Sequence, residues 1–164
     1  MNELKYKRRD GLKVIFVSTN NTCRSFMAEV VLRKKVEEAS REDVEVCSRG
    51  LVVLFEEPVH TRAADIVRQH GYKIYNFLSA QLEQEEITED TLIITMTEDQ
   101  KKKVLENYEG FLDVVTIYEY AGEFGDIRDP YGKNQDEYEC CFLQIQQLVD
   151  KIWKTQINLQ EEEL

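Results

Sequence analysis

A short polar segment of the chain has the residue types that could bind an anion. Ser18 to Ser25 (STNNTCRS), which we call the anion loop, follows an apolar run and precedes a helical pattern. Its small polar residues allow backbone N–H groups to turn inward around a tetrahedral oxyanion, and the guanidinium of Arg24 can bind two oxygens at once. A following helix would add the positive end of its dipole. Taken alone, the same composition also suits an ordinary helix cap.

The elements on either side of the anion loop place it where ligands bind in α/β proteins. Leu12 to Val17 (LKVIFV) is a nearly continuous apolar run, which predicts a strand buried on both faces. From Phe26 the apolar residues follow helical spacing, with Ala28 and Leu32 on one stripe. Ligands of open α/β sheets bind beyond the carboxyl ends of the strands, so the loop between this strand and this helix is a candidate site.

Strands and helices alternate along the rest of the chain. Further strands are predicted at 44–47, 92–95 and 114–117. Helices are predicted at 59–70, from a capping-box pattern at 97–100, and in a last segment whose apolar face is formed by Phe142, Ile145, Val149 and Ile152. This alternation predicts an α/β fold: a three-layer, doubly wound, flavodoxin-like sandwich with a four-stranded parallel sheet and helices on both faces.

Length, charge and hydropathy limit the classes of partner. A chain of 164 residues predicts one domain, at residues 12–157, between a basic N-terminal extension (1–11) and an acidic tail (158–164). A formal net charge of −11 disfavours nucleic acid, whose binding depends on many Lys and Arg contacts to phosphates. No apolar stretch has the length of a signal peptide or a membrane span. We therefore expect a cytoplasmic protein with neither nucleic-acid nor membrane partners.

Several cysteines and histidines show no catalytic pattern. Cys47, Cys140 and Cys141 are interpreted as small hydrophobic fillers in the reduced state, since a chain of this size needs no disulfide framework. His60 and His70 fall at the start and end of the second predicted helix, and both are interpreted as structural.

Two longer strings resemble a known family. Phe16 to Glu29 (FVSTNNTCRSFMAE) resembles the signature of the low-molecular-weight protein tyrosine phosphatases. Far downstream, Gly125 to Gly132 (GDIRDPYG) is similar to the Asp-Pro loop that carries the general acid of that family. The two strings occur in the family's order, and the resemblance spans residues 12 to 155.

The chain departs from the family signature at three positions of the first string. Ser18 replaces the nucleophilic cysteine, Asn20 replaces a glycine and Phe26 replaces a proline. At position 22 the chain has threonine, in which it is similar to the bacterial arginine phosphatases. Tyrosine-specific members of the family usually have a larger aliphatic residue at this position. The closest resemblance is therefore to the arginine-phosphatase-like branch.

The resemblance assigns roles to residues of both strings. In the family, a cysteine thiolate attacks phosphorus and forms a phosphocysteine, and Ser18 occupies the position of that cysteine. Arg24 would hold phosphoryl oxygens. Asp129 would protonate the leaving group and later activate water. The residues that would bind phosphate or substrate are Thr19, Asn20, Asn21, Thr22, Cys23, Ser25 and Tyr131. Asn20 could adopt a left-handed conformation in place of the glycine. No metal or cofactor is expected, and the partners would be a phosphorylated protein or peptide and inorganic phosphate or another oxyanion.

The sequence leaves alternatives open. Ser18 could be an engineered substitution that traps ligand or the mark of a natural pseudophosphatase, a phospho-binding module without turnover. An arsenate reductase would need a further redox cysteine pair, and 75–95 contains no cysteine. Phosphoarginine and phosphotyrosine both remain candidate substrates, with Thr22 favouring phosphoarginine.

Overall fold

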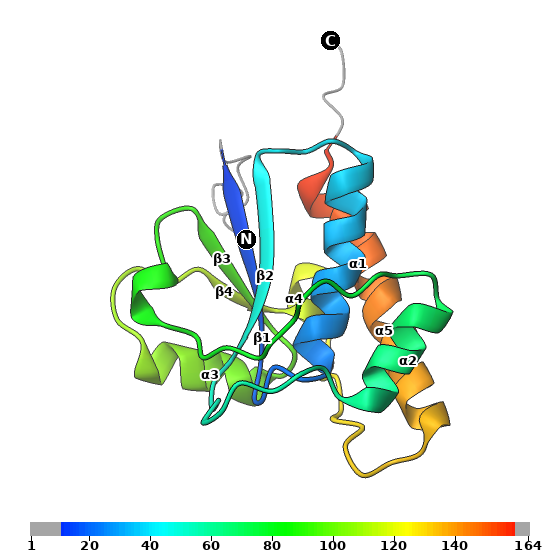
Figure 1. Ribbon diagram of the computed structural model, residues 1–164. Coiled ribbons are helices and arrows are strands. Elements are labelled where there is room, and N and C mark those ends of the chain that lie inside the picture. Colours follow the sequence, from blue (N-terminus) through cyan, green and yellow to red (C-terminus); the bar gives the residue numbers. More distant parts are fainter. Residues whose placement is uncertain (1–10, 160–164) are drawn as a thin grey trace.

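Four short runs rich in β-branched residues form one parallel sheet in the computed structural model, which describes residues 11–159 (Figure 1). The strands are β1 (Leu12–Ser18), β2 (Val44–Gly50), β3 (Thr91–Thr95) and β4 (Val114–Thr116). Their order across the sheet is β2-β1-β3-β4, and all pairs are parallel. The predicted four-stranded parallel sheet is confirmed.

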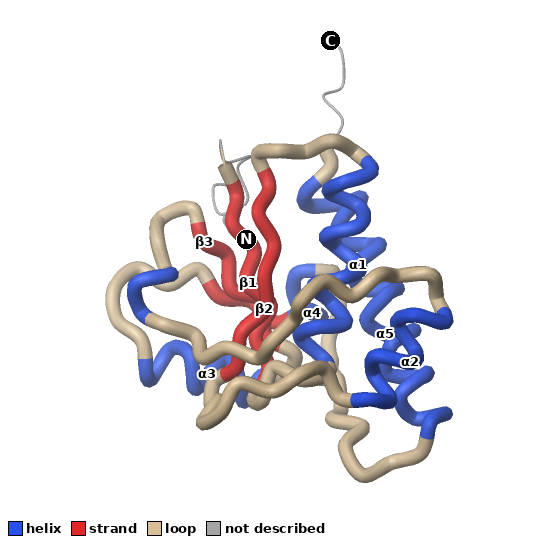
Figure 2. Tube along the Cα trace, in the orientation of Figure 1, coloured by secondary structure: helices blue, strands red, loops and turns tan. Residues whose placement is uncertain are grey.

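Helices cover both faces of the sheet, as predicted (Figure 2). One face carries α1 (Arg24–Glu38), α2 (Thr61–Gln69), the short α4 (Ile117–Tyr120) and α5 (Gln135–Ile152), which continues into a π-helical turn, Trp153–Ile157. The other face carries α3 (Glu98–Asn107) and a 3₁₀ turn, Gln84–Glu86. The arrangement is the three-layer sandwich that the alternating pattern predicts.

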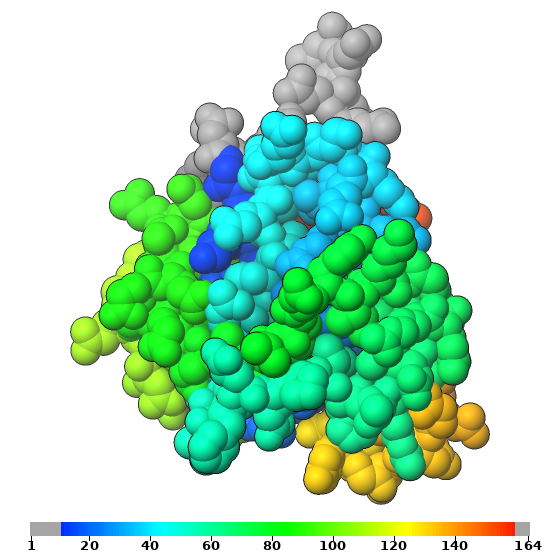
Figure 3. All heavy atoms as spheres, in the orientation of Figure 1, coloured from blue at the N-terminus to red at the C-terminus, as the bar shows by residue number. Residues whose placement is uncertain are grey.

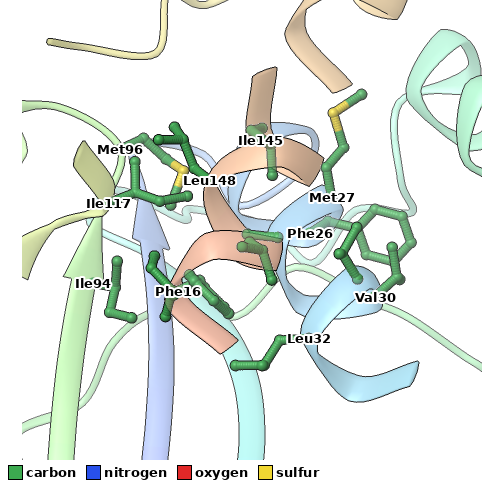
Figure 4. Packing of buried hydrophobic residues seen from close by; sticks show 14 of the residues in the cluster. Phe16, Phe26, Met27, Val30, Leu32, Ile94, Met96, Ile117, Ile145 and Leu148 are labelled. Atoms are coloured by element: carbon green, nitrogen blue, oxygen red, sulfur yellow. The ribbon is translucent and has the colours of Figure 1, made fainter. Parts of the chain in front are cut away.

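The side chains of the central strand, β1, alternate between two hydrophobic cores. Phe16 belongs to the larger core, together with Leu32 of α1 and Leu148 of α5, which Figure 4 labels. Ile15 points to the opposite face and packs in a smaller core with Val104 of α3. Because successive side chains of a strand point to opposite faces, a strand covered on both sides must be apolar throughout. This double burial fixes the carboxyl end of β1, and with it the start of the anion loop.

Several predicted boundaries differ from the structure by a few residues, and three of these differences have a clear physical cause. Strand β2 extends to Gly50 because its polar last residues still pair with β1, up to Ser18 opposite Gly50. Helix α1 begins at Arg24, ahead of the apolar stripe. Strand β4 ends at Thr116, whose hydroxyl accepts a hydrogen bond from the backbone N–H of Glu119 (3.0 Å) and so starts α4. In each case a backbone or capping contact, which the hydrophobic pattern does not report, sets the boundary.

Residues 1–10 and 160–164 lie outside the described part of the chain. The predicted basic extension and acidic tail therefore fall almost wholly outside it. Between residues 11 and 159, no helix combines the length and the apolar character needed to cross a membrane.

Candidate functional site

The anion loop lies at the carboxyl edge of the sheet, where the chain changes direction. The strand order places β2 on one side of β1 and β3 on the other, so the loops after β1 and β3 diverge at a topological switch point. The backbone N–H of Ile127 donates to the carbonyl of Met96 at the end of β3 (3.0 Å), which brings the downstream loop to the same edge. In Figure 3 this edge faces downward, between the segment near residue 55 (cyan to teal) and the segment near residue 130 (yellow to orange).

Ser18 sits at the floor of the anion loop. Its side chain is buried, and its Oγ lies 2.6 Å from Oγ of Ser25. The same Oγ accepts a hydrogen bond from the backbone N–H of Asn21 (3.3 Å). Neither partner is a base, so nothing in this pair of contacts would remove the hydroxyl proton of Ser18.

Asn21 holds the loop in shape through its side chain. Its amide Nδ2 donates to the hydroxyls of Ser25 and Ser48, at 2.9 Å each, and its Oδ1 accepts from the backbone N–H of Ala80 (3.0 Å). Asn21 is 1% exposed and has a φ of 61°, in the left-handed region that asparagine tolerates better than most residues. The sequence interpretation expected the left-handed conformation at Asn20, and this expectation is wrong. The turn of the loop places the left-handed conformation at Asn21, one residue later.

A buried carboxyl group extends this network away from the loop. The hydroxyl of Ser48 donates to Oε1 of Glu29 (3.1 Å), and the other oxygen of Glu29 lies 3.3 Å from the guanidinium of Arg33. Burial raises the pKa of Glu29, while Arg33 and Ser48 partly oppose the rise. Ser48 and Glu29 thus support Asn21 from β2 and α1.

The start of helix α1 faces the loop. Its N-cap residue, Cys23, makes no side-chain capping hydrogen bond, so no described side chain takes the first N–H groups of the helix. Such a helix start attracts an oxyanion through its N–H groups and dipole. The geometry therefore agrees with an anion-binding loop and not with a side-chain-capped helix.

Arg24 joins the anion loop to the downstream loop. Its Nη1 donates to the carbonyl of Ile127 (2.8 Å), and its Nη2 lies 3.7 Å from Oδ2 of Asp129. The Arg24 side chain is 8% exposed, whereas that of Asp129 is 44% exposed. A buried guanidinium with one fixed edge can present its remaining N–H groups to phosphoryl oxygens.

Two aspartates of the downstream loop have different surroundings. Oδ1 of Asp129 accepts from the backbone N–H of Tyr131 (3.0 Å), an Asx turn that orients its carboxyl group beside Arg24. Oδ1 of Asp126 accepts instead from the backbone N–H of Glu98 (2.9 Å) at the start of α3. Asp126 is a helix-capping group, and Asp129 is the carboxyl group at the site.

Most of the predicted site residues line one small cleft. The cleft is lined by Ser18, Arg24, Asp129, Tyr131 and residues 20–23. Thr19 and Ser25 do not line it: Thr19 accepts a hydrogen bond from Gln100 (3.2 Å), and Ser25 is fully buried behind Ser18. These two residues support the cleft from outside its lining.

Two residues of the cleft were missed by the sequence interpretation. His60, expected to be only structural, and Tyr138 both line it, and their rings stack at 5.2 Å between centroids. Burial raises the pKa of Tyr138 to about 12, so its phenol stays protonated at neutral pH. No pattern joins these positions to the anion loop, because His60 caps the start of α2 and Tyr138 belongs to α5. His70 is structural as predicted: its Nε2 lies 2.7 Å from Glu139.

The cysteines differ from the uniform filler role that was expected. Cys140 is exposed, so the filler interpretation is wrong for it, because only its neighbour Cys141 faces inward from α5. The neighbouring thiol of Cys141, followed by burial, raises the pKa of Cys23, with Arg24 opposing the rise. Cys23 is therefore a neutral thiol at neutral pH and not a second nucleophile.

Comparisons with known proteins agree with the observed fold. The family described as low molecular weight phosphotyrosine protein phosphatase matches residues 13–163. The low molecular weight protein-tyrosine-phosphatase PtpB of Staphylococcus haemolyticus is 30% identical over 141 residues, which cover 86% of this chain and 97% of the relative. The crystal structure of a low molecular weight protein tyrosine phosphatase from T. tengcongensis has a TM-score of 0.81 and 28% identity, and covers 87% of this chain and 97% of its own.

A further solved structure is that of an arginine phosphatase variant. It is a cysteine-to-serine mutant of the YwlE arginine phosphatase, described as having a phosphorylated active site serine. Its TM-score is 0.76 at 28% identity, with 86% of this chain and 93% of that chain covered.

Proposed function

The chain belongs to the low molecular weight phosphotyrosine protein phosphatase family, and from that premise we propose that its anion loop binds the phosphoryl group of a phosphorylated protein side chain. Arg24 and the first N–H groups of α1 would hold the phosphoryl oxygens and neutralise the charge that spreads over them during transfer. Cys23, Thr22 and Asn20 line the cleft around that group, and Tyr131 forms one wall.

The placement of Ser18 and Asp129 in one cleft is the observation that carries the proposal. Oγ of Ser18 lies at the floor, and the exposed carboxyl group of Asp129 lies at the mouth. A phosphorus atom between them could be attacked from the floor while its leaving atom takes a proton from the mouth. With cysteine at position 18, the helix start and Arg24 would favour a thiolate, since such surroundings lower a thiol pKa to about 3.5–7.5.

Serine at position 18 makes the first step slow and the second slower. In the first step the Ser18 oxygen bonds to phosphorus, the bond to the leaving atom breaks, and that atom takes a proton from Asp129. The hydroxyl proton of Ser18 then replaces the one that Asp129 has given. Hydrolysis of the resulting phosphoserine must expel an alkoxide, a poorer leaving group than a thiolate, so the chain would stall in a phosphorylated form. The phosphorylated serine of the YwlE mutant supports this outcome.

Comparison of three residues at position 18 tests the proposal. We expect Ser18→Cys to hydrolyse an aryl phosphate, while the Ser18 chain gains one phosphoryl group on Ser18 in a mass spectrum and Ser18→Ala gains none. All three forms should bind inorganic phosphate or vanadate in calorimetry, because the loop N–H groups and Arg24 are unchanged. Absence of turnover by Ser18→Cys above the Ser18→Ala form would overturn the enzymatic proposal.

A phospho-binding module without turnover is the second candidate, and Ser18 itself favours it. That function predicts reversible binding of phosphopeptides by the Ser18 chain with no phosphoserine formed. Sequencing the native gene at the codon for residue 18 separates an engineered substitution from a natural serine.

We further propose that the active form prefers phosphoarginine to phosphotyrosine. Thr22 lines the cleft and offers a hydroxyl that can bond a guanidinium, and the chain is similar to the YwlE arginine phosphatase. The relatives named protein-tyrosine-phosphatase make phosphotyrosine the alternative. Measurement of kcat/KM for both substrates on Ser18→Cys decides between them.

A further inference from the structure

We propose that His60 is a substrate-specificity residue, whose imidazole ring forms a wall of the cleft and favours a planar phosphorylated side chain over an aliphatic one. The inference rests on the proposed function, since it concerns the side chain that carries the phosphoryl group. His60 precedes α2 and has no sequence link to the anion loop. Only the fold brings it to the cleft that Ser18, Arg24 and Asp129 line.

The backbone of His60 is tied directly to the anion loop. Its N–H donates to the carbonyl of Thr22 (3.0 Å), in the segment of the loop that leads into α1. This bond fixes His60 beside Thr22, the loop residue on which the substrate preference was proposed to depend. Both residues line the cleft, so a substrate bound there lies within reach of both.

The orientation of the His60 ring is also fixed. Nδ1 accepts a hydrogen bond from the backbone N–H of Arg62 (3.3 Å), which places the ring hydrogen on Nε2. One face of the ring stacks on Tyr138 at an interplanar angle of 17°, and Tyr138 is almost fully buried. A ring held by a capping hydrogen bond and a buried neighbour is preorganised, so substrate contact with it costs little ordering entropy.

Tyr131 completes an aromatic edge around the cleft mouth. Its ring lies at 79° to that of His60, with 6.1 Å between centroids, and the residue is 73% exposed. When the phosphoryl group of a substrate is bound in the anion loop, the phenol or guanidinium plane of that substrate can contact these rings face to face or edge to face. An alkyl chain in the same place gains only apolar contact. A ring contact of this kind adds about threefold to tenfold in affinity beyond area burial.

The capping role of His60 must be separated from its role as a wall. His60→Ser keeps a side-chain oxygen that can cap α2 and removes the ring, because serine is among the best N-cap residues. His60→Phe keeps a planar ring and removes the capping nitrogen. A purely structural role predicts that Phe is the damaging substitution, and the proposed role predicts that Ser is.

The experiment measures binding of three ligands to the Ser18 chain by calorimetry: phenylphosphonate, butylphosphonate and inorganic phosphate. The phosphonates cannot be hydrolysed, so transfer to Ser18 does not interfere. We expect His60→Ser to weaken phenylphosphonate about threefold to tenfold and to leave the other two ligands unchanged. His60→Phe should bind all three within about twofold of the parent. In the Ser18→Cys background, His60→Ser should raise KM for an aryl phosphate with little change in kcat.

A matched control lies at the other end of the same helix. His70 pairs with Glu139 and packs on Phe142, away from the cleft lining, so His70→Asn should change none of the three affinities. Equal weakening of all three ligands by His60→Ser would overturn the inference, because it would show an effect on the anion loop. An undiminished phenylphosphonate affinity would overturn it as well. If the parent bound no inorganic phosphate, the proposed function itself would fail, and this inference with it.

Discussion

The left-handed residue of the anion loop allows a test in which hydrogen bonding and backbone strain are measured separately. Asn21→Gly removes the three side-chain hydrogen bonds to Ser25, Ser48 and Ala80 but tolerates the φ of 61°. Asn21→Ala removes the same bonds and also forces a β-carbon into the left-handed region. The difference between the two variants therefore reports the strain.

The expected magnitudes follow from these contacts. Three buried hydrogen bonds at about 1 kcal/mol each predict a loss of about 2–4 kcal/mol in the free energy of unfolding for Asn21→Gly. A left-handed alanine costs about 1–2 kcal/mol, and the stiffer unfolded chain returns about 0.4–1 kcal/mol. Asn21→Ala should therefore be less stable than Asn21→Gly by up to about 1.5 kcal/mol.

Urea unfolding followed by tryptophan fluorescence measures both differences. Trp153 is the single tryptophan and is 9% exposed, so its emission reports global unfolding. Asn20→Gly is the control: Asn20 is exposed and has no left-handed φ, and it should change stability by no more than about 0.5 kcal/mol. If Asn21→Ala proved as stable as Asn21→Gly, the strain argument would be refuted, and parent-like stability of both would refute the hydrogen-bond argument.

Three further predictions concern individual side chains. In the Ser18→Cys background, Asp129→Ala should lower kcat by about 10²–10⁴-fold for substrates with poor leaving groups and by less for activated aryl esters. Asp126→Ala should affect only stability. If the Asp126 variant instead showed the leaving-group dependence, the assignment of the general acid would be reversed. In the same background, Thr22→Ile should lower kcat/KM for phosphoarginine and raise it for phosphotyrosine, with a differential of about 1–3 kcal/mol; equal changes would make Thr22 a loop-shape residue. Burial raises the pKa of Glu29, so its carboxyl group stabilises the fold fully below its unfolded pKa and loses that contribution as pH rises through the folded value. Urea midpoints from pH 4 to 7 should therefore show the stability of Glu29→Gln rising relative to that of the parent as pH increases. A difference in stability that stays constant with pH would contradict the pKa shift.

The sequence determined the fold class because hydrophobic periodicity is a local property. Residues 14–17 of β1 are all apolar because both faces of the strand are covered there. The apolar stripe on α1 is also buried, but residues 24–32 of that helix are buried on every side, which the stripe did not predict. The capping box at Thr97 and Gln100 is present in the structure, since its two bonds lie within one helical turn. Contacts between residues that are close together in the sequence can therefore be predicted from the order of residue types.

The sequence also located the loop between β1 and α1 and the place of Ser18 in it, because the string around Arg24 is contiguous. What it could not determine were the partners that the loop acquires from elsewhere. Ser48 reaches Asn21 from β2, His60 reaches Thr22 from the start of α2, and Cys141 reaches Cys23 from α5.

The family resemblance assigned the general acid to Asp129, but only the tertiary structure shows that Asp129 lies at the cleft and that Asp126 caps a helix. Asp126 and Asp129 lie in one short loop, and composition gives both the same carboxyl group. The loop turns between them, so that Asp126 meets the first turn of α3 and Asp129 meets Arg24. Side-chain direction in an irregular loop depends on backbone angles that are fixed by packing, and for this reason the contacts of the two carboxyl groups appear only when the chain is folded.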